Sequence, residues 1–580
     1  MSAGPVSTGS PAVPILQAPA GGVTVRMYRQ GLGDCFLLAF PTADPAQSYY
    51  VMIDCGVVQN TPGGSDRLND VAKHIKAATG NHIHLLVVTH RHWDHMAGFN
   101  RAGDVFGSIQ IDNLWLPWLE NLADPAAQQV WGKTGQALAA LTAAIARAPT
   151  ALSHVQDLLD NFFGETLGAA AATGAAASSP MANVIQLVKD PGKVGYRKPG
   201  EGPLALPATG GTGVPSVQVF VLGPPSDPKQ LAQMDPSSGA GRETYLLQQG
   251  LEAQLAFSLG RLPMDNMSEE EGRLVDFSFP FDPHLQITRG EAENIKFFRQ
   301  HYGFDDGAPA SASPAGESAA TTTAAGGAPA SDAGSSPITG ASGAPGPGKA
   351  VTETDVPTVA DAPDWRRIDT DWTAGAEELA LQIDNVINNT SLVLAFEFVK
   401  SHKVLFFAAD AQVGNWLSWN GLTWKRPDGT TVSSADLLTA TVLYKVGHHG
   451  SVNATVIKLA DGTTPWGVGL MSSPDLVALL SADHVIGLEQ SGVWHMPDDQ
   501  VRDGLLKQTK GRVIRIDKGV PQPPAGGDPE VWQEFLRHIQ PDPATIQPYP
   551  PGTPDPKYPQ EGRRDAVTPQ PLYIDFNVIE

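Results

Sequence analysis

The stretch THRHWDHMAG, residues 89–98, indicates both the fold and the site, because it places four ionisable side chains close together: His90, His92, Asp94 and His95. It follows IHLLVVT, residues 83–89, an apolar run that is typical of a strand covered on both faces. Imidazoles and a carboxylate form the ligand set that divalent metals such as zinc prefer. A polar loop that happens to be rich in histidine is the alternative, and the high cost of unpaired buried charge disfavours it.

The spacing of these side chains predicts two metal ions rather than one. In an extended turn, His90 and His92 point the same way, while Asp94 and His95 face a second point nearby. Two adjacent metals are a known arrangement in hydrolytic sites. Gly98 follows in the chain, and a residue without a side chain lets the backbone approach a neighbour closely.

Two later apolar runs also end in ionisable residues. KVLFFAAD, residues 403–410, places Asp410 at the C-terminal end of a strand, where ligands gather in open α/β sheets. One carboxylate can bridge two cations and hold them roughly 3.5–4 Å apart. VLYKVGHHGS, residues 442–451, ends in His448 and His449, which point to opposite faces of an extended chain. We therefore expect one metal-ligating imidazole here, and we favour His449 as the ligand and His448 as an acid or phosphate contact.

Asp54 ends the run YYVMIDCG, residues 49–56, and fits a carboxylate that orients a ligand imidazole or the metal-bound water. The alternative is a turn aspartate before Gly56. His495 precedes a helix start, where it either approaches the site or, as we favour, flanks the helix at the surface. The other histidines lack such neighbours and are expected to be structural or exposed: His74, His82, His84, His154, His284, His301, His402, His484 and His538.

Hydrophobic patterning predicts a mixed α/β chain. β-Branched and aromatic runs bounded by Gly, Asp and Pro predict core strands, the first three as a β-meander: residues 23–28, 33–40, 49–56, 217–225, 388–398, 402–410, 441–451 and 512–516. Helical spacing predicts a helix over residues 65–79, with Ser65 as its N-cap. Further helices are expected over residues 124–164, 473–482 and 497–509, and an edge strand over residues 572–579.

Length and composition favour one core with large insertions. The 580 residues exceed one ordinary domain, and 60 Gly with 49 Pro indicate long irregular segments. Residues 305–363 are almost all small, polar or proline, so they predict a disordered linker. Cys35 and Cys55 are too few for a disulfide framework, and we expect two small buried apolar side chains. Trp416, Trp419 and Trp424 are expected in the core rather than in a pocket wall.

The charge of the chain restricts its partners. Lys and Arg total 39 against 61 Asp and Glu, so the net charge of -22 excludes a general nucleic-acid coat protein. The compact basic segment KVGYRKPG, residues 193–200, is interpreted as a solvated loop. The sequence shows neither a secretory signal nor a run of roughly 18–20 apolar residues that could cross a bilayer, so the expected location is the cytoplasm.

The motifs resemble a known family. HRHWDHMAG is similar to the H-x-H-x-D-H signature of the metallo-β-lactamase fold superfamily. Asp54 before this motif, and Asp410 and the His448–His449 pair after it, lie in the order expected for that superfamily. QGLGDCFLLAF, NTSLVLAF and KVGHHGS resemble motifs of the branch typified by the metallo-hydrolase domain of the DNA-uptake competence protein, which includes a bacterial phosphorylcholine esterase. The resemblance covers roughly residues 23–120, 216–223 and 388–517.

The resemblance implies an αββα sandwich with large helical and disordered insertions. By this resemblance, His90 and His92 would hold the first metal. The second metal would be held by Asp94, His95 and His449. Asp410 would bridge the two metals. Many members have a third histidine for the first metal, but here Gly223 lies in its place, so water, an inserted residue such as His284, or weak occupancy remain open. The chain would divide into an N-terminal arm, two core halves with their strand, three inserted segments and a Pro-rich tail: residues 1–22, 23–120, 121–215, 216–223, 224–304, 305–363, 364–519 and 520–580.

The leading functional hypothesis is a hydrolase that uses two divalent cations, with zinc favoured over manganese or iron. A water acidified by the cations would attack as hydroxide, most readily on a phosphodiester or another phosphoester. Catalytic roles are assigned to Asp94, His448 and Asp54. Small-molecule substrates remain open, including lactones, whereas the net charge disfavours nucleic acid. The rival hypothesis is a metal-binding interaction protein derived from a degraded hydrolase, and a β-lactam hydrolase is a weaker third.

Overall fold

The computed structural model describes the following residues: 13–59, 61–163, 180–206, 209, 216–233, 373–459, 463–491, 495–540 and 572–580. The chain divides into two units, and every described residue belongs to the unit formed by Met1–Ser278 and Asp371–Glu580. The other unit, Phe279–Thr370, contains the expected linker over residues 305–363 and lies outside the described residues. His284 and His301 lie outside them as well.

Two large mixed sheets form the core of the described structure. The first has eight strands in the order β18 (Ile539–Gln540), β19 (Tyr573–Ile579), β1 (Gly22–Tyr28), β2 (Cys35–Pro41), β3 (Ser48–Cys55), β5 (Leu85–Val87), β7 (Leu114–Pro117) and β8 (Val194–Arg197). The second has seven strands in the order β17 (Val513–Arg515), β16 (Val477–Leu480), β15 (Thr441–Lys445), β12 (Val404–Phe407), β11 (Val393–Phe398), β10 (Val217–Gly223) and β9 (Leu204–Ala205). Each sheet combines antiparallel with parallel pairs.

The two sheets face each other across a shared apolar core. Alternate residues of each strand point inward, as the two-residue period of a strand requires, so side chains of both sheets meet there. Phe36 of β2 lies edge to face with Phe407 of β12, with ring centroids 5.6 Å apart. Phe40 of the same strand stacks on Phe396 of β11 at 5.9 Å. These contacts hold the two sheets against each other.

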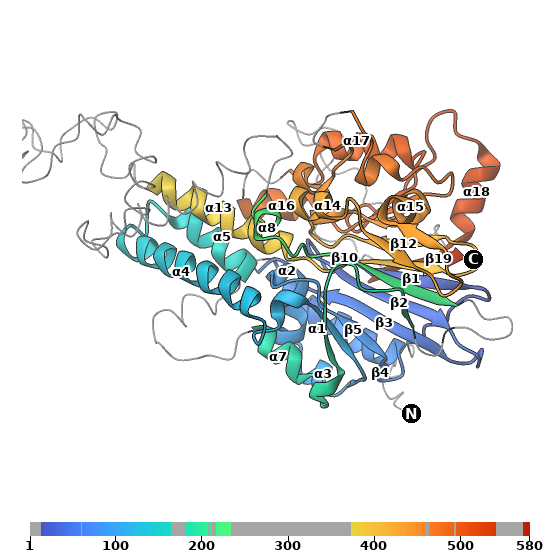
Figure 1. Cartoon of the computed structure of the whole chain (residues 1–580), viewed down its shortest axis with the longest axis horizontal. Helices are drawn as coiled ribbons and strands as arrows, with labels where there is room; N and C mark the ends of the chain where they lie inside the picture. Colours follow the sequence, from blue (N-terminus) through green and yellow to red (C-terminus); the bar gives the residue numbers. More distant parts are fainter. Residues whose placement is uncertain are drawn as a thin grey trace, which may run out of the picture. The chain divides into compact units, whose positions relative to one another are not determined.

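Helices cover the outer faces of both sheets (Figure 1). On the first sheet lie α1 (Gly64–Ala78), α2 (Trp93–Arg101), α3 (Gly103–Gly107) and α7 (Pro180–Gln186). On the second lie α14 (Val413–Ser418), α15 (Ser434–Thr439) and α17 (Asp499–Gln508), where Trp416, Trp419 and Trp424 are core residues as expected. Further helices are α8 (Pro228–Leu231), α16 (His484–Ser491) and α18 (Pro529–Arg537).

Three long helices form a separate apolar cluster beside the sheets (Figure 1). They are α4 (Pro125–Arg147), α5 (Ser153–Phe163) and α13 (Thr373–Asn389), whose buried faces meet through Leu141, Leu159 and Ile383. Asp124 caps α4 by accepting a hydrogen bond from the N–H of Ala126, which explains the start signal in the sequence. No described helix is long and apolar enough to cross a membrane.

Most of the expected elements are confirmed. The eight predicted core strands are present, and α1, α4, α5 and α17 lie where helical spacing predicts them. Cys35 and Cys55 are buried free thiols. Strand β19 is paired on both sides, with β1 and β18, so it is not the edge strand that was expected.

Several local predictions are wrong for physical reasons. Gly63, with a left-handed backbone, precedes α1, so Ser65 is not its N-cap. The apolar run at residues 473–482 forms strand β16 rather than a helix, because a short run buried on both faces shows no helical period. The run at residues 83–89 is divided between β4 (His82–Ile83), in a small sheet, and β5.

Further corrections concern segments expected to be irregular. In the arm at residues 1–22, the described part packs against the domain: Leu16 is buried, and its N–H donates to the carbonyl of Ala78. The basic segment at residues 193–200 contributes edge strand β8 rather than a solvated loop. The Pro-rich tail includes helix α18, whose Trp532 and Phe535 join the core between the sheets.

Candidate metal centre

The candidate residues meet where strands of the two sheets end. Asp54 lies at the end of β3, and Asp410 follows β12 after two alanines. His449 lies in the short 3-10 turn Gly447–Gly450 after β15, and Asp94 and His95 lie in the first turn of α2. Since the carboxyl ends of neighbouring strands lie at one edge of a sheet, the fold brings residues far apart in sequence together.

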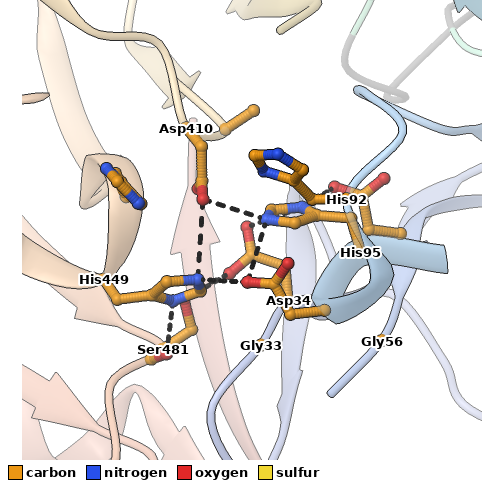
Figure 2. Close-up of polar contacts among 12 residues, drawn as sticks. Gly33, Asp34, Gly56, His92, His95, Asp410, His449 and Ser481 are labelled. Atoms are coloured by element: carbon orange, nitrogen blue, oxygen red, sulfur yellow. Dashed lines mark hydrogen bonds and ion pairs between the residues drawn. The ribbon is translucent and has the colours of Figure 1, made fainter. Parts of the chain in front are cut away.

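Four buried side chains form a compact group: Asp94, His95, Asp410 and His449. One ligand atom from each lies within 4.8 Å of all the others. Asp410 lies between the two imidazoles, with Oδ2 3.1 Å from Nε2 of His95 and 3.5 Å from Nε2 of His449 (Figure 2). Asp94 Oδ2 lies 2.8 Å from Nε2 of His449. Two carboxylates and two imidazoles aimed at one point form a donor set suited to a divalent cation such as zinc.

Each imidazole of the group is oriented from behind. Nδ1 of His95 donates to Oδ2 of Asp54 at 2.8 Å, and Asp54 in turn accepts from the N–H and the hydroxyl of Thr89. Nδ1 of His449 donates to the carbonyl of Ser481 at 2.8 Å (Figure 2). A proton fixed on Nδ1 leaves Nε2 available to a cation, as in many metal-ligating histidines. Asp54 therefore lies in the orienting position that the sequence predicted, and not in a simple turn.

A buried ion pair lies beneath the group and was not predicted. Lys445 contacts Asp34, and its Nζ lies 3.3 Å from Oδ1 of Asp410. Burial opposes the charge on Lys445, but the carboxylates of Asp34 and Asp410 outweigh it and raise the pKa of Lys445. The ammonium holds Oδ1 of Asp410, so Oδ2 faces His95 and His449. The hydroxyl of Ser481 donates to Asp34 and secures the other side of the pair.

The electrostatics of the group fit a cation site. Burial disfavours a charged imidazole, but Asp410 and Asp94 outweigh it and raise the pKa of His95 well above its usual value. The same neighbours raise the pKa of His449 against burial. Burial likewise opposes the charge on Asp410, yet His95, His449 and Lys445 hold its pKa well below the usual range. Without a cation, protons on the imidazoles thus balance the carboxylates, and a bound cation would displace protons.

His90 and His92 lie beside this group and not within it. The ring centroid of His90 lies 4.1 Å from that of His95 and 4.9 Å from that of His92. Nε2 of His90 is fully buried and has no hydrogen-bond partner among the described residues. His92 precedes α2 as its N-cap residue, and its Nε2 lies 3.5 Å from Oδ1 of Asp384 in α13.

The double histidine after β15 does not run on as an extended strand. His448 and His449 have left-handed backbones, with φ of 41° and 52°, so they form a turn in place of the alternation that we expected. His449 reaches the four-residue group, and the ring centroid of His448 lies 6.0 Å from that of His449. Asp54 and Ala409 also have positive φ. Backbone conformations of this kind are costly and gather at functional sites.

Close backbone packing fixes the first turn of α2. A Cβ on Gly56 would lie 2.1 Å from the carbonyl carbon of Asp94, and a Cβ on Gly33 would lie 2.6 Å from its oxygen (Figure 2). A Cβ on Gly98 would lie 2.4 Å from Sγ of Cys55, which confirms the close approach expected at Gly98. These contacts leave little freedom in the position of Asp94.

The sequence motifs also contain residues of this centre for which no role was predicted. Asp34 belongs to QGLGDCFLLAF and Lys445 to the strand before the double histidine. Ser391 belongs to NTSLVLAF, and its hydroxyl accepts a hydrogen bond from the N–H of Asp410 at 3.2 Å. Asp34, Lys445 and Ser391 thus lie within sequence motifs that the patterning already indicated, and these motifs are the signal by which they could be found. For Asp384 and Ser481 the sequence gives no signal.

Some other histidines and one cavity do not belong to the group. His495 contacts His484, with ring centroids 4.8 Å apart. His82, His84 and Asp112 form a second, half-buried cluster. A cavity of about 390 Å³ is lined by residues around α18 and β19, and none of the candidate ligands lines it. Among the candidate residues His448 is the most exposed, at 7%.

No protein-family model matches this chain, and no curated protein matches it.

Proposed function

We propose that the protein is a metal-dependent hydrolase of the metallo-β-lactamase fold, acting on a phosphoester. The observation that supports the proposal best is the buried group of Asp94, His95, Asp410 and His449, with both imidazoles oriented from behind. Two facing sheets with helices on their outer faces agree with an αββα sandwich, in which a site of this kind lies at strand ends.

The chain would hold two divalent cations, with zinc as the first choice. His90 and His92 would contribute to the first site, the trio of Asp94, His95 and His449 to the second, and Asp410 would lie between them. Bound cations would acidify a water molecule and neutralise charge on the developing oxyanion. Phosphoryl oxygens suit such a pair of cations, and this charge complementarity favours a phosphoester over an uncharged substrate.

The residues of the chain have distinct tasks in this proposal. Asp54 and the carbonyl of Ser481 hold protons at Nδ1 of the two imidazoles. Lys445 holds Asp410 in place through Oδ1. Burial lowers the pKa of His448, so this imidazole is neutral at pH 7 and can donate a hydrogen bond to a phosphoryl oxygen. Its greater exposure makes His448 the candidate that touches the substrate first.

Hydrolysis of bis(4-nitrophenyl) phosphate by the full-length protein, loaded separately with Zn²⁺, Mn²⁺ and Fe²⁺, tests the proposal. We expect Asp410→Ala to reduce the rate at least about 100-fold, because the charge that stabilises the transition state is lost. Asp428→Ala changes an exposed turn residue and serves as the matched control. Equal rates for the wild type and Asp410→Ala, or no turnover with phosphoesters, lactones and thioesters, would leave the interaction-protein hypothesis in its place.

A further inference from the structure

The first metal site lacks its expected third histidine, and the fold excludes one at that place. A Cβ on Gly223 would lie 2.2 Å from Oδ1 of Asn415. Asn415 cannot move aside easily, because its amide donates to the carbonyls of Asn389 and Ser391. A histidine therefore does not fit at residue 223 without rearranging the first turn of α14. A third protein ligand would have to come from another element.

Asp384 of helix α13 lies beside His92. Its Oδ1 lies 3.5 Å from Nε2 of His92, and its Oδ2 accepts a hydrogen bond from Asn388 at 3.2 Å. The residue is only 8% exposed, yet its Oδ1 has no hydrogen-bond partner among the described residues. Nε2 of His90 is also fully buried and has no hydrogen-bond partner among the described residues. A carboxylate oxygen and an imidazole nitrogen, each able to bind a metal and neither hydrogen-bonded among the described residues, thus lie near His92.

Packing of α13 fixes the direction of Asp384. Ile383 and Ile387 lie in the apolar cluster with α4 and α5, so the residue that follows Ile383 is turned about 100° away from that cluster. The C-terminal end of the helix is anchored by Asn389, which bonds α8 and the segment after β12. The helix therefore presents a carboxylate at His92 through rigid contacts, and an uncompensated carboxylate in such a place is costly.

We infer that Asp384 is the third protein ligand of the first metal site, together with His90 and His92, and that helix α13 supplies it in place of the missing histidine. The inference deepens the proposed function and rests on it. A cation bound beside His92 would satisfy Oδ1 of Asp384. Two imidazoles and one carboxylate form a set that binds Fe²⁺ and Mn²⁺ as well as Zn²⁺, so this site accepts harder cations than a three-histidine site does.

Metal stoichiometry of the full-length protein tests the inference without reference to turnover. The protein is stripped with a chelator, reconstituted separately with Zn²⁺ and Mn²⁺, and analysed by plasma mass spectrometry and titration calorimetry. We expect two equivalents for the wild type and one for Asp384→Asn, which keeps the shape of the side chain and the contact with Asn388. Asp384→His should restore the second equivalent of Zn²⁺ but not of Mn²⁺. Glu377→Gln changes a carboxylate of the same helix whose side chain is 56% exposed, and this variant should bind two.

Thermal unfolding separates a lost ligand from a damaged fold. Without metal, Asp384→Asn should melt no lower than the wild type, because a buried carboxylate is removed. With metal it should gain less stability than the wild type. Two equivalents bound by Asp384→Asn with unchanged affinity, or a single equivalent bound by the wild type, would overturn the inference. A protein that binds two metals through Asp384 without hydrolysing any ester would refute only the proposed function.

Discussion

At the scale of single residues, His95 shows how the centre is organised. Asp54 lies behind it, at Nδ1, and Asp410 lies in front of it, at Nε2. The rear carboxylate also accepts two hydrogen bonds from Thr89, so its position does not depend on a bound cation. The imidazole is thus held in one tautomer and one orientation before any metal arrives, which reduces the ordering cost of binding.

Replacement of Asp54 by Asn should weaken metal binding without removing a ligand. An amide cannot balance the charge on His95, and its NH₂ group would face a donor at either Thr89 or His95. We expect the Zn²⁺ affinity to fall about 10–100-fold, measured by competition with a chromophoric chelator. Asp44→Asn, in an exposed loop, is the control. An unchanged affinity would show that the contact between Asp54 and His95 is only structural.

His74, on α1, gives a pH dependence that does not involve the metal centre. Burial and, less strongly, the charge of Arg26 lower its pKa to about 4. The unfolded chain titrates near 6.5, so the folded state favours the neutral ring. Its contribution to stability is fully present above about pH 6.5 and is lost as the pH falls towards 4.

The substitution His74→Gln should therefore reduce the loss of unfolding free energy between pH 7 and pH 5. Urea denaturation of the chelator-treated protein at both pH values measures this loss. His154, whose side chain is 54% exposed, provides the control through His154→Gln. The expectation fails when His74→Gln and the wild type lose the same free energy over that interval.

At the scale of elements, the junction after α13 connects this helix to the end of the second sheet at which Asp410 lies. Asn389 donates to the carbonyls of Leu231 and Gln233 near α8. Its Oδ1 accepts from the N–H groups of Gln412 and Asn415. One buried amide thus joins three chain segments directly beside Asp410. The position of α13, and of Asp384 on it, depends on this junction.

Asn389→Ala should destabilise the protein by about 3 kcal/mol, since several buried donors and acceptors would lose their partner at about 1–3 kcal/mol each, with partial relaxation. Glu377→Ala lies on the same helix and changes a side chain that is 56% exposed, so less than about 0.5 kcal/mol is expected. Equilibrium urea unfolding of the two variants compares them. Equal stabilities would contradict the role of the junction.

At the scale of the whole described structure, β1 and β19, which are far apart in sequence, lie side by side in the first sheet. β19 pairs with β1 over seven residues, and Arg26 lies opposite Asp575 in that register. The guanidinium makes two hydrogen bonds of 2.7 Å to the carboxylate across 549 residues of sequence. Burial raises the pKa of Asp575, and Arg26 opposes this change. The guanidinium also lies 3.6 Å from the ring centroid of Tyr573.

Asp575→Ala should cost about 3–5 kcal/mol, because it leaves the buried charge of Arg26 without a partner. The double variant Arg26→Met with Asp575→Leu removes both charges and should recover most of the lost stability. Chemical denaturation of the wild type and the single and double variants gives the coupling free energy. A single variant within about 1 kcal/mol of the wild type would show that the pair is solvated or replaceable.

The sequence allowed much of the fold and part of the centre to be predicted. β-Branched and aromatic runs bounded by Gly, Asp and Pro gave the core strands, because this composition is written in consecutive residues. Short runs buried on both faces, such as Val477–Leu480 in β16, were misassigned because they show no helical period. Helix α13 was missed, since its apolar positions face other helices and not the sheets.

By itself, the sequence determined which residues are candidate ligands and that they follow apolar runs: His90, His92, Asp94, His95, Asp410 and His449. Such patterns are local, since an apolar strand followed by His or Asp is written in consecutive residues. Only the tertiary structure decided that Lys445 and Asp34 neutralise each other beneath Asp410, that Asn415 fills the space beside Gly223, and that Asp384 faces His92. These relations join distant segments, and sequence separation carries no information about which buried charges will meet.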